Sequence, residues 1–173
     1  VIKVDKTNIR VAAISAFASQ QLEREDPYPF CRNPLNFVHV CHLRDTVADA
    51  DDLISNLTKE LGNRNRTLEP NGATTGIGSQ SQENLFLNPT DGLSKLNRVL
   101  KAAVHNYYAQ YKSANNLFID LWPSETRMRA WFGPLSESEN QAGRTHLLDR
   151  WLSGIVYLEP PEMQKPNDGA TSF

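Results

Sequence analysis

Cysteine is scarce in this sequence, and so is any excess of charge. The two cysteines, Cys31 and Cys41, are too few for a disulfide scaffold. They could form one bridge or remain two reduced thiols, so the cellular compartment stays open. Eighteen Lys and Arg residues against twenty Asp and Glu residues leave a net charge of −2. General nucleic-acid binders and polybasic membrane-surface proteins hold their partners by positive charge, so neither class is expected.

A long hydrophobic run is also missing. The longest apolar stretch, from Val11 to Ala18, is interrupted by Ser15 and is far shorter than the roughly 20 residues that cross a bilayer. No transmembrane segment is therefore expected. The 173 residues, of which 39% are hydrophobic, are enough for one soluble domain with a core of ordinary size and generous loops.

The first 36 residues are expected to form an N-terminal arm and a lead-in loop. The chain begins at Val1 without an initiator Met, so we expect a processed protein or a piece of a longer polypeptide. Residues 1–18 place three cations before small and apolar residues, a pattern faintly typical of a targeting sequence. A first strand or an extended arm is the plainer interpretation. Residues 19–36 contain three prolines and predict a loop.

Two amphipathic helices give the clearest pattern. Apolar residues at spacings of three and four predict one helix that is capped by Asp45 or Thr46 and ends at Gly62. Its apolar positions are Val47, Ala50, Leu53, Ile54, Leu57 and Leu61. The second helix is expected from about Gly92 to Lys112. Its apolar face consists of Leu93, Leu96, Leu100, Val104, Tyr107 and Tyr111.

Strand-like segments cluster later, after a polar, glycine-rich loop over residues 63–82. Predicted strands cover residues 37–43, 117–122, 127–135 and 151–158, and residues 169–173 begin another. Within 127–135 the residues alternate, with Met128, Ala130 and Phe132 on one side and Arg127, Arg129 and Trp131 on the other. Helices followed by strands predict an α+β domain in which Leu53, Leu57, Leu96, Leu100 and Val104 pack against an antiparallel sheet.

The strand predicted over residues 151–158 has two faces. The face with Leu152, Gly154, Val156 and Leu158 is expected to be the more buried, with Gly154 admitting a neighbouring backbone.

Histidine and cysteine raise the question of a metal site. His39 and Cys41 share one face of a predicted strand, but no second closely spaced pair completes a zinc site, so half-buried strand residues are expected. His105 lies on the polar side of the second helix and is expected to be solvated. His146 precedes the strand predicted over residues 151–158 and is followed by Asp149. It is either a structural histidine or a metal ligand.

The late segments together resemble a known family. Their blocks are Met128-Arg129-Ala130-Trp131-Phe132, Gly143-Arg144-Thr145-His146 and Trp151-Leu152-Ser153-Gly154-Ile155-Val156-Tyr157-Leu158-Glu159-Pro160-Pro161. They are similar to the 2-oxoglutarate/Fe(II) oxygenases, in which a His-x-His-Pro stretch runs into Trp-Leu-Ser-Gly-Val-Tyr-Tyr-Leu. Residues 75–80 and 169–173 are similar to flanking parts of that family, so the resemblance covers roughly residues 37–173.

The resemblance implies both a fold and a cofactor set. The fold is α+β, a double-stranded β-helix (jelly roll), in whole or in part, over residues 37–173, flanked by the two main helices and preceded by the arm of residues 1–36. The cofactors are Fe(II) and 2-oxoglutarate. Because non-haem Fe(II) takes two histidines and one carboxylate on one face, His146 is the implied metal ligand, with Asp149 as a second.

Two departures from the family pattern leave two functions open. The residue two positions after His146 is Leu148, which cannot bind iron, and the sequence given stops at Phe173, before the family's distal histidine and 2-oxoglutarate anchor. The first interpretation is an oxygenase-fold protein that has lost its metal site and serves, without a cofactor, as a binding or structural subunit among other protein subunits. The alternative is an active 2-oxoglutarate/Fe(II)-dependent hydroxylase whose remaining ligands lie beyond Phe173.

Overall fold

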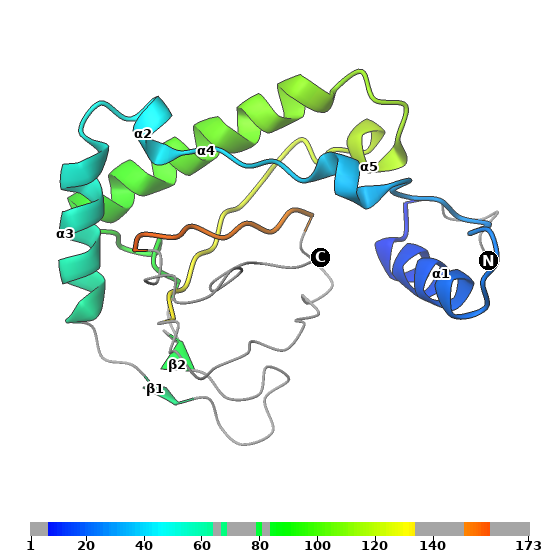
Figure 1. Ribbon diagram of the computed structural model, residues 1–173, viewed down its shortest axis with the longest axis horizontal. Helices are drawn as coiled ribbons and strands as arrows, with labels where there is room; N and C mark the ends of the chain where they lie inside the picture. The colour runs from blue at the N-terminus through cyan, green and yellow to red at the C-terminus, as the bar shows by residue number, and fades with distance from the viewer. Residues whose placement is uncertain (1–6, 64–66, 69–78, 81–83, 134–150, 160–173) are drawn as a thin grey trace, which may run out of the picture. The chain divides into compact units, whose positions relative to one another are not determined.

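The computed structural model describes residues 7–63, 67–68, 79–80, 84–133 and 151–159, and the described part is mainly helical (Figure 1). Its helices are α1 (Ile9–Gln21), the 3-10 helix η1 (Pro34–Phe37), α2 (Leu43–Thr46), α3 (Ala50–Gly62), α4 (Asp91–Tyr111) and α5 (Leu117–Asp120). Strands β1 (Thr67–Leu68) and β2 (Ser79–Gln80) pair antiparallel, with Thr67 opposite Gln80. None of these described helices is long and apolar enough to cross a bilayer.

The predicted jelly roll is wrong for the part of the chain that the structure describes. The only sheet found there is the two-residue pair of β1 and β2. Residues 127–133 and 151–157 carry no strand assignment, and residues 37–43 contain the end of η1 and the start of α2. Alternating and β-branched residues favour an extended backbone, but a sheet also needs a partner strand in register, which the pattern alone does not supply.

Two helices replace predicted extended segments. Asn8 caps α1, since its side-chain oxygen accepts hydrogen bonds from the amides of Arg10 at 3.1 Å and Val11 at 3.2 Å. Asn116 caps α5 in the same way through the amide of Phe118 at 3.0 Å. The predicted strand or arm is therefore corrected to a helix from Ile9 onward, and the strand predicted over 117–122 is corrected to α5, because a capping side chain satisfies backbone amides that a helix start leaves free. Residues 1–6 lie outside the described residues.

The chain forms two compact units. Among the described residues, unit 1 comprises 7–40 and 103–126, and unit 2 comprises 41–63, 67–68, 79–80, 84–102, 127–133 and 151–159. The division falls within α4, between Ala102 and Ala103. A domain boundary between residues 36 and 37 stays a prediction.

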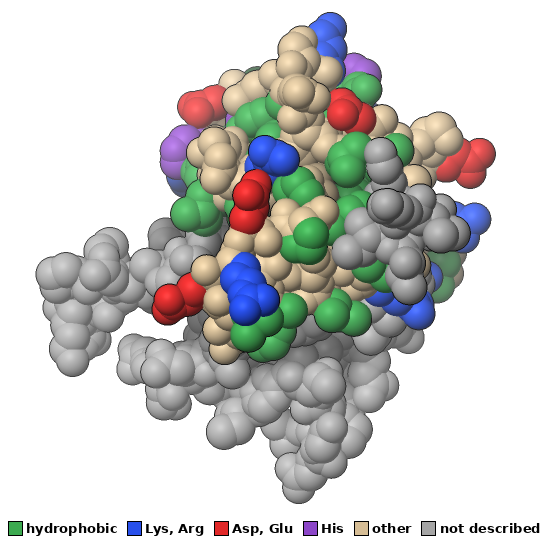
Figure 2. Space-filling view, turned by 90° about the vertical axis from the view of Figure 1, so that its right-hand side faces the viewer, with side chains coloured by type: hydrophobic (Ala, Val, Ile, Leu, Met, Phe, Trp, Pro, Cys, Tyr) green, Lys and Arg blue, Asp and Glu red, His purple; other side chains and the backbone are tan. Residues whose placement is uncertain are grey.

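Aromatic rings form the interior of unit 1. The rings of Tyr107 and Tyr111 have centroids 4.7 Å apart, and Phe37 lies 5.2 Å from Tyr111. Phe118 and Trp122 extend this cluster from α5 and the residues after it. The Tyr107 hydroxyl donates a hydrogen bond to the Phe37 carbonyl at 2.8 Å, so the aromatic interior is also fixed by a polar contact. Figure 2 shows hydrophobic side chains at the surface among charged ones.

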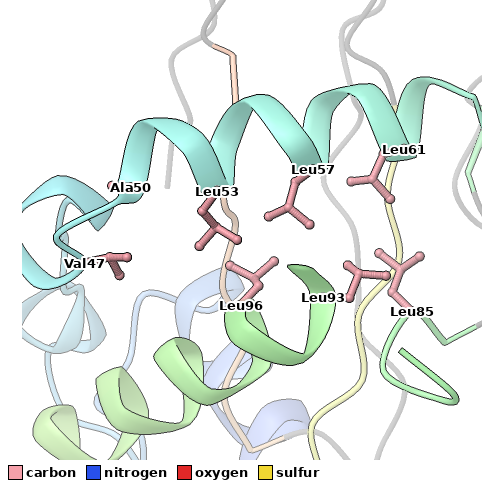
Figure 3. Packing of buried hydrophobic residues seen from close by; sticks show 8 residues of the cluster. All are labelled: Val47, Ala50, Leu53, Leu57, Leu61, Leu85, Leu93 and Leu96. Atoms are coloured by element: carbon pink, nitrogen blue, oxygen red, sulfur yellow. The ribbon is translucent and has the colours of Figure 1, made fainter. Parts of the chain in front are cut away.

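Leucines from α3 and α4 form the core of unit 2 (Figure 3). Leu57 and Leu93 are fully buried, and the labelled leucines of the two helices point toward one another. A Cβ at Gly92 would lie 3.4 Å from Leu57 Cδ2, so the glycine allows the start of α4 to approach α3 closely. The Thr90 hydroxyl also donates to Glu60 at 2.8 Å. The second long helix predicted from the sequence is confirmed, and the first is confirmed from Ala50 to Gly62. Its predicted caps, Asp45 and Thr46, are wrong, because both residues belong to α2.

The composition of this core corrects a further expectation. Leu53, Leu57 and Leu96 are buried in it as predicted, whereas Leu100 is only partly buried against it. Val104 lies beyond residue 102 and belongs to unit 1. No sheet packs against these helices in the described residues; extended segments contribute Ala130, Phe132 and Leu158 instead.

Candidate functional site

The metal ligands implied by the sequence, His146 and Asp149, lie outside the described residues. Iron and 2-oxoglutarate therefore stay predictions. Within the described ranges, no group of three or more His, Cys, Asp or Glu side chains is arranged to hold a metal ion. His39 and Cys41 are exposed on non-strand backbone, which corrects their prediction as half-buried strand residues. His105 is exposed on α4, as predicted.

Burial disfavours the charged forms of the Cys31 thiol and the Tyr107 phenol in unit 1. Burial raises the pKa of the Cys31 thiol, and a hydrogen bond with the Asn116 side chain offsets this only in part. A thiol with a raised pKa is a poor nucleophile, because the thiolate is the reactive form. Burial, with smaller contributions from Tyr111 and Cys31, raises the pKa of Tyr107 to about 12. Cys31 and Cys41 are both free thiols.

The most organised exposed surface lies on the extended segment 127–133 of unit 2. Two hydrogen bonds hold this segment at Ala130: its carbonyl accepts from the Leu85 amide at 2.8 Å, and its amide donates to Asn84 Oδ1 at 3.1 Å. Ala130 and Phe132 also contact the leucine core. The inner side of the segment is thus attached to the helices of unit 2.

The opposite side of this segment carries Arg127, Arg129 and Trp131, here called the arginine strip. All three side chains are exposed, while Met128, Ala130 and Phe132 are half-buried, so the predicted alternation is confirmed. Residues two apart on an extended backbone lie on the same side, about 6.5–7 Å apart. Neither arginine forms an ion pair with another described residue. The backbone therefore sets the spacing at which two permanently charged side chains begin.

Residues 151–158 add exposed apolar side chains to unit 2. Leu158 packs against the leucine core, whereas Ile155 is 64% exposed and Val156 is 39% exposed. The prediction that Val156 lies on a buried face is wrong. Among the described residues no atom lies within 4 Å of a Cβ built on Gly154, so the expected close backbone approach is not found there. Alternation predicted two faces, but it could not say whether anything covers the second one.

No protein-family model, curated protein or solved structure matches this chain. The resemblance to the 2-oxoglutarate/Fe(II) oxygenases thus depends on the sequence pattern alone. The surface found on unit 2 was visible in the sequence only as two arginines at alternate positions before Trp131. Its attachment through Asn84 was not visible, because that contact joins residues 46 positions apart.

Proposed function

We propose that this chain is a protein-binding subunit that captures an extended, acidic segment of a partner protein on unit 2. The observation that carries the proposal is the arginine strip. Arg127 and Arg129 point away from a segment whose opposite side is held by Asn84, Leu85 and the leucine core. Such a segment can present its charges without having to be ordered first, which lowers the entropic cost of binding.

The chemistry of the arginine strip favours carboxylates on alternate residues of the partner. A second extended chain repeats its same-side positions at the same interval, so glutamate or aspartate side chains two residues apart match Arg127 and Arg129 in spacing and charge. Segment 151–158 adds apolar contacts.

The expected affinity is modest. Exposed ion pairs contribute roughly 0.2–1 kcal/mol each and weaken with salt, so two of them change binding by about two- to thirtyfold. The remaining affinity comes from apolar contacts. This kind of interaction suits a subunit that is held in an assembly by several contacts at once.

A labelled peptide tests the proposal. The probe is a ten-residue peptide that alternates glutamate with threonine, and the control peptide has the same composition with all glutamates in one half. We expect fluorescence anisotropy to show preferential binding of the alternating peptide. The Arg127→Gln/Arg129→Gln variant should bind it about two- to thirtyfold more weakly. The matched Arg98→Gln/Lys101→Gln variant, which removes two exposed charges from α4, should bind it like the wild type.

Three results would contradict this function. They are equal binding of the two peptides, equal loss of binding in both double variants, and tighter binding of an oligothymidine of similar length. The last result would assign the arginine strip to single-stranded nucleic acid. The oxygenase alternative stays a separate prediction, because its ligands His146 and Asp149 lie outside the described residues.

A further inference from the structure

Helix α1 of unit 1 places the bulky apolar residues Ile14 and Phe17 outward, while residues that face inward include small and polar ones. Ile14 is 70% exposed and Phe17 is 65% exposed, while Ala12 is 5% exposed and Ser19 is 8% exposed. Ser15 adds a polar inner contact, since its hydroxyl donates to Asp26 at 2.5 Å. A surface helix of a globular protein normally has the reverse arrangement. The outward face of α1 therefore leaves apolar surface in water that another surface could cover.

The outward residues form one continuous face. Positions 10, 13, 14, 17 and 21 follow the three- and four-residue spacing of a single helical side, and all five are exposed. Leu22, at the C-cap, is also exposed, at 62%. Ile14 and Phe17 lie at its middle, and Arg10 and Gln21 lie at its two ends. The face is thus apolar at its centre and polar at both ends.

The charges around α1 are reversed relative to its own dipole. Arg10 lies in the first turn, where the helix end is positive and no acidic residue is present. Glu23 and Glu25 follow the last turn, which is the negative end and contains no basic residue. Residues 23–26 carry three carboxylates and one arginine, Arg24. An antiparallel second helix would place a negative end and these carboxylates beside Arg10.

We infer that a second copy of this chain covers the outward face of α1, with the two α1 helices packed antiparallel. A two-fold axis near residue 15 or 16 brings Ile14 and Phe17 of one copy against the same residues of the other. Position 10 of one copy then lies opposite position 21 of the other, close to Glu23 and Glu25. The two-fold axis repeats this contact, so Arg10 of each copy faces Glu23 and Glu25 of the other.

The size of the helix limits the strength of this contact. A 13-residue helix is about 20 Å long, so the pair buries less than the roughly 800 Å² per partner of a standard interface. We therefore expect reversible self-association with a dissociation constant on the order of 10–100 µM.

Sedimentation equilibrium of the 173-residue chain between about 1 and 500 µM tests the inference, a range that brackets the expected constant. Wild type should shift from monomer to dimer. Phe17→Glu should stay monomeric, because it places a charge at the centre of the face. Arg10→Glu alone and Glu23→Arg/Glu25→Arg alone should both weaken the dimer. An equimolar mixture of these two variants should recover association, since each copy then meets opposite charge once more.

The controls separate this interface from general stickiness and from unfolding. Leu87 is 70% exposed in unit 2, so Leu87→Glu should dimerise like the wild type. Circular dichroism should show unchanged helix content in every variant, because the replaced side chains are exposed. A monomer at all concentrations, or a Phe17→Glu variant that dimerises normally, would overturn the inference, as would a mixture without recovery. Binding of monomeric protein to phosphatidylserine vesicles would assign the face to a lipid surface instead.

Discussion

The backbone amide of Ala130 donates a hydrogen bond to Asn84 Oδ1 at 3.1 Å, and the same oxygen accepts from the Phe86 amide at 3.2 Å. One side chain thus joins the residues before α4 to the segment that carries the arginine strip. The position of Arg129 and Trp131, the neighbours of Ala130, depends on this contact. A surface formed by an extended segment needs such an attachment, because no sheet holds it in the described residues.

Asn84→Ala should destabilise unit 2 and weaken peptide binding together. It removes the acceptor of two backbone amides, so we expect a loss of about 1–2 kcal/mol in the free energy of unfolding, measured by urea denaturation. Asn56→Ala, at an exposed position of α3, should change it by less than about 0.5 kcal/mol. Unchanged stability in Asn84→Ala would mean that the contact does not hold the segment.

The leucine core allows a second prediction. Leu57 is fully buried between α3 and α4, so Leu57→Ala should cost about 2–5 kcal/mol of unfolding free energy. Leu100 is only partly buried against the same core, and Leu100→Ala should cost less. Paired urea melts of the two variants measure the difference. An equal effect would show that the end of α4 within unit 2 is packed as tightly as its start.

The leucine helices could be predicted from the sequence because their pattern reports directly on burial. Leu53 and Leu57 recur on one face, opposite exposed Asp51 and Asp52, and only a helix places them together. Helix α1 escaped prediction because Ile14 and Phe17 do not coincide with its buried side. Its helical start depends on the Asn8 cap, a local contact that a hydrophobic pattern does not show.

The extended segments were predicted only in part. Alternation between Arg129 and Ala130 gave the exposed and inner sides of segment 127–133 correctly. It could not give the partner of the backbone, which is Asn84 and Leu85 in place of a neighbouring strand. A strand pattern describes one chain segment, whereas a sheet is a property of two.

Tyr107 makes the free energy of unfolding of the protein fall at alkaline pH. Its pKa is raised to about 12, whereas a tyrosine in an unfolded chain titrates near 10. The unfolded state therefore loses this proton first, and the contribution of Tyr107 to stability falls as the pH rises from about 10 to about 12. Below about pH 10 the contribution is complete.

Urea melts at several pH values between about 8 and 12 check this dependence. Tyr107→Phe lacks the phenol, so the difference in unfolding free energy between wild type and variant should narrow as the pH rises. It should also reflect, below pH 10, the lost hydrogen bond from the hydroxyl to the Phe37 carbonyl. A difference that stays constant across the range would show that the phenol titrates alike in both states.

The last prediction concerns iron, since it separates the binding subunit from the oxygenase alternative. A catalytic Fe(II) site needs about three protein ligands, and iron held by one imidazole and water exchanges freely. The sequence offers His146, Leu148 where a second histidine is required, and Asp149 one position out of register. We expect the 173-residue chain to retain no stoichiometric iron after anaerobic loading and gel filtration, as measured by elemental analysis. The His146→Ala variant should retain as little iron as the wild type. Iron retained by the wild type and lost in His146→Ala, together with saturable 2-oxoglutarate binding, would favour the oxygenase, because both observations require a metal site that includes His146.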